Sequence, residues 1–183
     1  MFVFGHVGLT IGAAYAFRLA ASSWRKRAVA LSMDFRLVIV GSMAPDLIDK
    51  PLGLWIAPGL VDNSLRSIAH TLVFAVTLLG LGLTVWALGR GQKLTLAAVS
   101  SAGHIMFDRT WQTASVLFWP FLGWDFGASY PPVGEWASRH VSDALRFFTD
   151  FPELVGFIII VAVTARLVHT KNTRRFIRGG VVS

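Results

Sequence analysis

Six residues of the kinds that bind metal ions lie in or beside separate apolar stretches of this chain. They are His6, Asp46, Asp49, His70, His104 and Asp108. An unpaired ionisable side chain is costly in an apolar environment, and it persists there mainly where it pairs, lines a water-filled cavity or holds an ion. Histidines and carboxylates without sulfur ligands suit Zn²⁺, Mn²⁺ or Fe²⁺. Six candidate ligands are enough for one or two divalent ions, which could activate water for hydrolysis.

The spacing of four of these residues supports a shared site. His104 and Asp108 are four residues apart, so on a helix both side chains project from one face and could share one ion or a water molecule bound to it. Asp46 and Asp49 are three residues apart and again share a helix face. Asp108 could instead pair with Arg109, although adjacent side chains on a helix point apart.

The other members of the set also have structural alternatives. A single histidine in an apolar helix, such as His6, often forms a hydrogen bond between helices rather than binding a metal. Asp46 and Asp49 could cap a helix or pair with Lys50 and Arg66. A metal site is therefore inferred from the whole set and not from any one residue.

The composition indicates the class of protein that must position this set. Hydrophobic residues make up 54% of the 183 residues and charged residues 15%, and the mean hydropathy is +0.60. Soluble domains contain roughly 45–50% apolar and about 25% charged residues. We therefore expect a single integral membrane domain over residues 1–183. The absence of cysteine excludes disulfides and thiolate metal sites.

The apolar stretches predict an all-α polytopic membrane bundle of about five spans, one of them short or re-entrant. The candidates cover residues 2–21, 37–48, 68–88, 94–107 and 154–168, and a shorter aromatic piece covers 116–124. Residues 37–48 would form a helix only ~18 Å long, against a hydrocarbon core of ~30 Å. This span therefore either starts earlier, near residue 28, or ends at Pro45. Small residues at 97–103 suit close helix packing, which predicts a central fourth helix.

The basic residues predict the topology. The run 25–27, Arg36, the turn 90–93 and the segment 166–178 together hold most of the 17 lysines and arginines but only one acid, Asp34. The positive-inside rule makes this side cytoplasmic. The net charge of +7 is therefore an orientation signal, so the lipid bilayer is the expected partner and nucleic acid is not.

This topology places the six residues near the opposite, extracytoplasmic face of a prokaryotic plasma (inner) membrane. The same face carries an exposed loop over 125–152, with one amphipathic helix near 136–148, and the chain ends in a basic cytoplasmic tail over 169–183. A cleaved signal peptide is not expected, because the basic run 25–27 follows the first apolar stretch instead of preceding it.

Several short motifs together resemble a known family. They are GHVG at 5–8, GSMAPDLIDKP at 41–51, RSIAHTL at 66–72, GHIMFD at 103–108 and FWP at 118–120. In this order they resemble the membrane-bound metal-dependent hydrolases related to the bacterial inner-membrane LexA-binding protein. That family is distantly similar to zinc-dependent phospholipase C and P1-type nucleases, which are all-helical phosphodiesterases.

The resemblance implies a zinc site in which His6, His70, His104 and Asp108 are ligands, together with an aspartate of the Pro-Asp motif. Many relatives have Pro-Asp-x-Asp, whereas this chain has Pro-Asp-x-x-Asp-Lys, so either Asp46 or Asp49 could be that ligand. The soluble phosphodiesterases use further ligands downstream, and here only three residues could serve: Glu135, His140 and Glu153. A third metal ion is therefore not expected.

The function expected from these residues is a metal-dependent hydrolase in which metal-activated water attacks a phosphoester, plausibly of a phospholipid or a lipid-linked phosphate. Asp49 or Asp108 could act as the general base if it is not a ligand. Arg66, Lys50 and Arg109 could hold the phosphate, or could simply extend to the membrane interface. Three tryptophans could line a lateral route for lipid: Trp111, Trp119 and Trp124.

Two functions of other classes remain open. A metal-ion or proton transporter would also use intramembrane His and Asp residues, but it predicts such residues at several depths along a path. A non-catalytic membrane scaffold with a structural metal site predicts a closed coordination shell and a large apolar surface for a partner.

Overall fold

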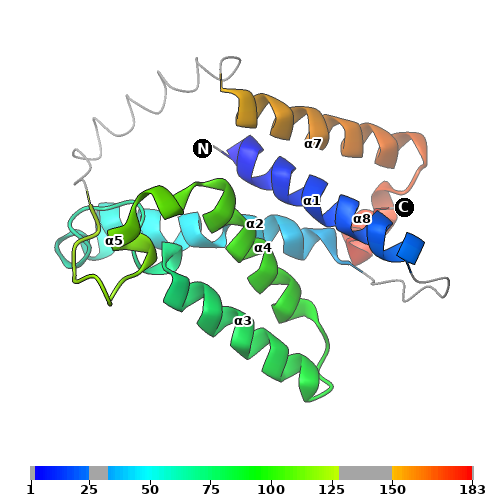
Figure 1. Ribbon diagram of the computed structural model, residues 1–183. Helices are drawn as coiled ribbons and strands as arrows, with labels where there is room; N and C mark the ends of the chain where they lie inside the picture. Colours follow the sequence, from blue (N-terminus) through cyan, green and yellow to red (C-terminus); the bar gives the residue numbers. More distant parts are fainter. Residues whose placement is uncertain (1–2, 25–32, 128–149, 183) are drawn as a thin grey trace.

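The computed structural model describes residues 3–24, 33–127 and 150–182, and every regular element in these residues is helical (Figure 1). The all-α prediction is therefore confirmed. The longer helices are α1 (Val3–Trp24), α2 (Phe35–Pro51), α3 (Leu72–Ala87), α4 (Lys93–Phe107) and α7 (Phe151–His169). The short ones are η1 (Leu52–Ile56), η2 (Pro58–Leu60), η3 (Ile68–His70), η4 (Thr110–Gln112), α5 (Ala114–Leu117) and α8 (Thr173–Gly179). The expected amphipathic helix near 136–148 lies outside the described residues, as do Glu135 and His140.

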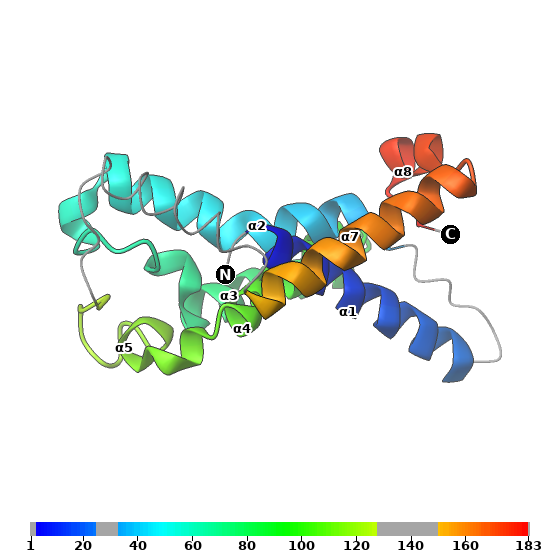
Figure 2. The same cartoon turned by 90° about the horizontal axis from the view of Figure 1, so that it is seen from above.

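Helices α1 and α7 lie side by side and diverge towards their C-terminal ends (Figures 1 and 2). They are closest at two glycines, because a Cβ atom on Gly8 would lie 2.1 Å from the Gly156 carbonyl oxygen. A Cβ atom on Gly156 would in turn lie 2.1 Å from the carbonyl oxygen of Phe4. Small residues of this kind let two backbones approach closely in a membrane, where no hydrophobic effect drives helices together.

Helix α4 packs against both α2 and α3, as its run of small residues predicts. A Cβ atom on Gly41 of α2 would lie 2.4 Å from the carbonyl oxygen of Ala97. On the other side, a Cβ atom on Gly82 of α3 would lie 2.8 Å from the Cα atom of Thr95. Close backbone approach on both faces makes α4 the central helix of this part of the bundle.

Two helices in the described part of the chain are long and apolar enough to cross a membrane, with candidate spans at Val3–Ala21 and Phe151–His169. Helix α3 is apolar but has only 16 residues. The bundle of five spans is therefore not confirmed, whereas the membrane class agrees with both candidate spans.

Helix α2 does not end at Pro45, which corrects one of the two sequence alternatives. It begins at Phe35, after the N-cap Asp34, and passes through Pro45 to Pro51, where it continues as the π-helix η1. A proline inside a helix removes one backbone hydrogen bond. Here Pro45 is buried against the rest of the bundle, so tertiary packing maintains the helix despite that loss.

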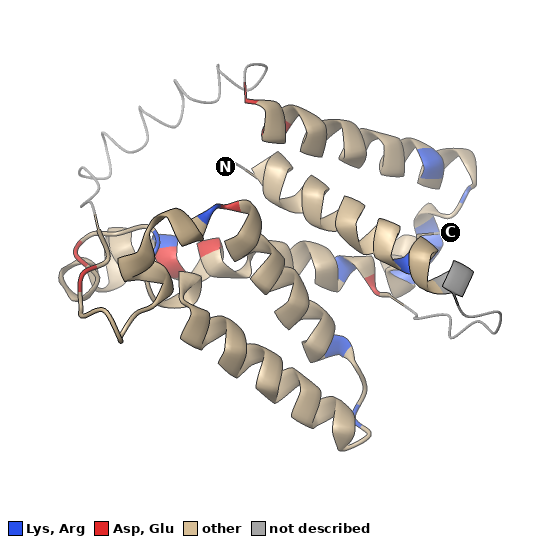
Figure 3. Cartoon of the chain, viewed as in Figure 1, with Lys and Arg blue, Asp and Glu red and all other residues tan. Residues whose placement is uncertain are grey.

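In the described part of the chain, charged residues form a mainly basic region and a region in which acidic and basic residues lie together (Figure 3). Basic residues lie on α8, towards the C-terminal ends of α1 and α7, and at the turn between α3 and α4. Acidic residues lie where α2 passes the end of α4, together with Lys50 and Arg66, and also in the loops that hold Asp62 and Asp125 and at the start of α7. Asp34 is the acid within the basic region, and its hydrogen bonds from Arg36 lower the pKa of its carboxyl group.

The α1–α7 contact can be tested with one substitution at the closest approach. Gly156→Ala should lower the free energy of unfolding by about 1–3 kcal/mol, because the added methyl group must push the two helices apart. Thermal unfolding of the detergent-solubilised protein, followed by circular dichroism, measures the effect. The control is Gly80→Ala in α3, where a Cβ atom meets nothing within 4 Å; it should be neutral or stabilising. Equal losses in both variants would contradict the close contact.

Candidate metal centre

Side chains from separate helices converge on one buried centre. His6 comes from α1, Asp46 from α2, His70 from η3, and His104 and Asp108 from the end of α4. All five are buried. Their potential ligand atoms form two overlapping sets, His6 with Asp46 and His104, and His70 with His104 and Asp108, and within each set the atoms lie within 4.8 Å of one another.

His104 is oriented by the backbone of α2. Its Nδ1 atom lies 2.6 Å from the Ser42 carbonyl oxygen. Because a carbonyl oxygen can only accept, Nδ1 carries the proton and donates it to this bond. One residue earlier on α2, the carbonyl oxygen of Gly41 would normally accept a hydrogen bond from the backbone N–H of residue 45. Residue 45 is a proline, which has no N–H, so this helical hydrogen bond is missing. The neutral His104 ring therefore presents the lone pair of Nε2 to the centre.

His70 is oriented by Asp49, whose side chain is fully buried. An Asp49 carboxylate oxygen lies 2.7 Å from His70 Nδ1. The same carboxylate accepts hydrogen bonds from the backbone N–H groups of Ser67, Ala69 and His70 at 2.7–3.2 Å. These contacts use both Asp49 oxygens and stabilise the η3 turn. Asp49 therefore fixes the orientation of the His70 ring, in the way that a carboxylate commonly orients a metal-binding histidine.

The two oriented histidines meet at their Nε2 atoms, which are 3.2 Å apart. Since each ring donates its Nδ1 proton elsewhere, both Nε2 atoms carry lone pairs in the neutral rings, and these lone pairs repel each other. A cation between the rings, either a proton or a metal ion, would relieve the repulsion. Two imidazole nitrogens at ~2.0–2.1 Å from a tetrahedral Zn²⁺ would be ~3.3 Å apart, so the observed separation fits one ion shared by His70 and His104.

Asp46 supplies a carboxylate oxygen to the same point. Its Oδ1 atom lies 3.8 Å from Nε2 of His70 and 3.8 Å from Nε2 of His104. The other oxygen, Oδ2, accepts a hydrogen bond of 2.7 Å from Lys50, one turn later on α2. The two aspartates of the Pro-Asp motif therefore differ in role, because Asp46 faces the histidine nitrogens and Asp49 lies behind one of the rings.

Asp108 lies on the other side of the centre and is paired with Arg66. The guanidinium group of Arg66 contacts both carboxylate oxygens, through Nη2 at 3.0 Å and through Nε. Asp108 also lies 3.6 Å from His6 Nε2 and 4.0 Å from His70 Nε2. Arg109 has a left-handed backbone conformation and is exposed, so the expected alternative of an Asp108–Arg109 pair is not observed.

His6 joins the centre by stacking on His104, with ring centroids 3.8 Å apart and an angle of 17° between the planes. Glu153, at the start of α7, is fully buried and accepts a hydrogen bond of 2.9 Å from the backbone N–H of Gly5. Glu153 is outside both sets of potential ligands and instead holds the first turn of α1, which carries His6.

The three tryptophans expected along a lipid route lie in the segment that follows α4. Trp119 packs edge-on against Trp124 at 4.8 Å, and both rings contact Phe126. Phe126 belongs to a small apolar cluster that also includes Ile68 of η3. Trp119 and Trp124 therefore support the turn that carries His70, while Trp111 is largely exposed.

Comparison with known proteins identifies one family. A family model described as YdjM inner membrane protein matches residues 1–176. No curated protein and no solved structure matches the chain. The family description names an inner membrane protein and includes neither a hydrolase activity nor phospholipase C.

Metal content is the first test of the centre. Purified protein should contain a transition metal, and His70→Ala and His104→Ala should each lower its affinity at least tenfold, because each removes one of the facing nitrogens. Elemental analysis after dialysis against buffered zinc measures this. The control is His169→Ala, at the exposed end of α7, which should bind as the native protein does. Native protein without metal under these conditions would contradict the site.

The different positions of the two aspartates predict different effects. Asp49→Asn should weaken metal binding about 10- to 100-fold while leaving the stoichiometry at saturation unchanged, because the residue acts through the His70 ring. Asp46→Asn removes a charged oxygen that faces the nitrogens, so stoichiometric binding should be lost. Isothermal titration with zinc distinguishes the two cases, and the reverse order of effects would assign the ligand role to Asp49.

Proposed function

This chain belongs to the YdjM inner membrane protein family, and we propose that it is a membrane-embedded metal-dependent hydrolase that cleaves a phosphoester, with a lipid phosphate as substrate. The observation that carries the proposal is the pair of facing Nε2 atoms of His70 and His104, with the carboxylate of Asp46 beside them. Such a buried set of nitrogen and oxygen donors matches the sites that bind zinc, or manganese or iron, without sulfur.

A divalent ion held here would polarise a phosphoryl oxygen and lower the pKa of a bound water molecule towards ~7. The residues support one or two ions, since His104 belongs to both sets of potential ligands. We assign His70, His104 and Asp46 as the primary ligands, and we assign His6 and Asp108 as the further ligands available to a second ion. Asp49 positions His70 through its Nδ1 atom.

Asp108 and the two cations beside the centre have the positions needed to handle a proton and a phosphate. Asp108 could accept a proton from water if it is not a ligand. Arg66 is 37% exposed and Lys50 30% exposed, so each reaches from a buried carboxylate towards the outside. Arginine can bind a phosphate in a bidentate manner. We propose that both cations hold the phosphate of the substrate at the mouth of the centre.

The surface around the centre favours a lipid substrate. Leu47 and Ile48 of α2, next to Asp46 and Asp49 in the sequence, are 64% and 42% exposed, and Met106 of α4 is 64% exposed. Apolar side chains facing outward at this level can contact acyl chains while the polar centre faces inward. A substrate that reaches the centre laterally, from the lipid, suits this arrangement. In the proposed topology the centre faces the extracytoplasmic side.

The arrangement favours a hydrolase over a transporter. A transporter needs ionisable groups at successive depths along a path. In the described residues the buried His and Asp side chains gather at one level, between the first turn of α1 and the end of α4. A scaffold with a structural metal remains the alternative that activity measurements test.

Hydrolysis of phosphoesters by the purified protein is the direct test. In detergent with zinc or manganese, the protein should cleave bis(p-nitrophenyl) phosphate or phosphatidylglycerol, lose activity on chelation and regain it when metal is added back. Asp108→Ala should lower kcat by about 10²–10⁴-fold. If Asp108→Ala retains its metal, Asp108 is assigned as the general base. If this variant loses its metal, Asp108 is assigned as a ligand. A fully metal-loaded protein that cleaves no phosphoester would overturn the proposal in favour of a structural site.

A further inference from the structure

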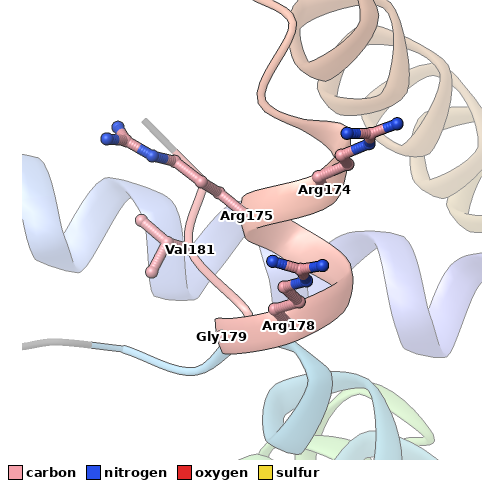
Figure 4. A pocket seen from close by; sticks show the side chains of 5 residues that line it. All are labelled: Arg174, Arg175, Arg178, Gly179 and Val181. Atoms are coloured by element: carbon pink, nitrogen blue, oxygen red, sulfur yellow. The ribbon is translucent and has the colours of Figure 1, made fainter.

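Helix α8 carries a cluster of basic side chains outside the candidate metal centre. Three arginines, Arg174, Arg175 and Arg178, line a pocket of about 440 Å³ together with Gly179 and Val181 (Figure 4). Arg178 lies one turn after both other arginines, and the side chains of Arg174 and Arg175 extend to opposite sides of α8. Figure 4 shows Arg175 and Val181 on the same side of α8.

The cluster is held in place by the rest of the fold. Arg36 of α2 donates a hydrogen bond of 2.8 Å to the carbonyl oxygen of Ile177. The backbone N–H of Phe35 donates a hydrogen bond of 2.8 Å to the carbonyl oxygen of Gly180. Gly180 has a φ of +66°, and a Cβ atom there would overlap the Asp34 carboxylate. Val182 is fully buried. The basic tail expected from the sequence is therefore a docked helix, so its pocket is formed before any ligand binds.

The charge of the cluster calls for an anion. In the described part of the chain, none of the three arginines forms an ion pair with a carboxylate, and all three are exposed. Like charges one turn apart on a helix repel each other. Guanidinium groups bind phosphate in a bidentate manner, and an anion in the pocket that the three arginines line would offset the repulsion.

Apolar neighbours and position favour a lipid as the source of that phosphate. Ile177 is 64% exposed and Val181 39% exposed beside the arginines. Helix α8 follows directly after α7, which has the length and hydropathy of a membrane span. A short helix with arginines and exposed apolar residues at the end of a span is suited to the membrane surface, where anionic headgroups lie. We propose that this pocket binds the phosphate of an anionic phospholipid such as phosphatidylglycerol.

The test compares binding of phosphatidylglycerol with that of phosphatidylcholine, using native mass spectrometry of the delipidated full-length protein. Native protein should bind phosphatidylglycerol preferentially. The triple variant Arg174→Gln/Arg175→Gln/Arg178→Gln should bind it about 100-fold more weakly, as expected for three interfacial arginines. The matched control is Arg90→Gln/Lys93→Gln, at the exposed turn between α3 and α4, which should retain the native preference.

Several outcomes would overturn this site. If the triple variant is helical by circular dichroism and binds phosphatidylglycerol like the native protein, the pocket is not the site. If inorganic phosphate displaces the lipid at equal concentration, the pocket recognises free phosphate instead. Should the triple variant fail to fold, Arg175→Gln alone must weaken binding about fivefold, and native affinity in that variant would also reject the proposal.

Discussion

The candidate centre depends on two imidazole rings that each give their Nδ1 proton to a fixed acceptor. The Ser42 carbonyl holds His104 and the Asp49 carboxylate holds His70, so their Nε2 lone pairs face each other at 3.2 Å. Two lone pairs at this distance destabilise the fold unless a cation lies between them. The protein accepts this cost in a buried position, and such a cost is characteristic of a binding site. Every other residue of the centre is arranged around this pair.

Close contacts at glycines hold the helices in the positions that the two facing histidines require. Gly41 brings α2 against α4 at the level where the Ser42 carbonyl meets His104, and a larger residue there would displace the carbonyl. Gly8 and Gly156 bring α1 against α7, one turn from His6. In a membrane the packing of backbones replaces the hydrophobic effect as the source of helix association. Some of the contacts that stabilise the bundle therefore also position the donors.

The sequence predicted the helical class, the membrane setting and the residues that meet, because these follow from composition, charge and helical spacing. The predicted number of about five spans is not confirmed, since α2 and α4 are short and carry polar residues whose burial depends on tertiary contacts. The sequence also left Asp46 and Asp49 equivalent. Their difference arises from the η3 turn, whose backbone N–H groups surround Asp49. Nothing in the sequence pointed to Ser42, because it orients His104 through its main-chain carbonyl group, which any residue provides.

His6 connects the two parts of the bundle. The α1–α7 pair packs against α2 through an apolar core that includes Ile11, Phe35 and Leu167. At one end of this contact, His6 stacks on His104 and approaches Asp108. Glu153 of α7 binds the turn that carries His6, so α7 influences the centre without contributing a donor to it. An ion bound by His6 together with Asp46 and His104 would bridge α1 to the α2–α4 unit, and its binding free energy would then contribute to helix association. If the centre binds metal as proposed, metal binding and assembly of the bundle would be coupled for this reason, and loss of metal would loosen the contact between α1 and α4.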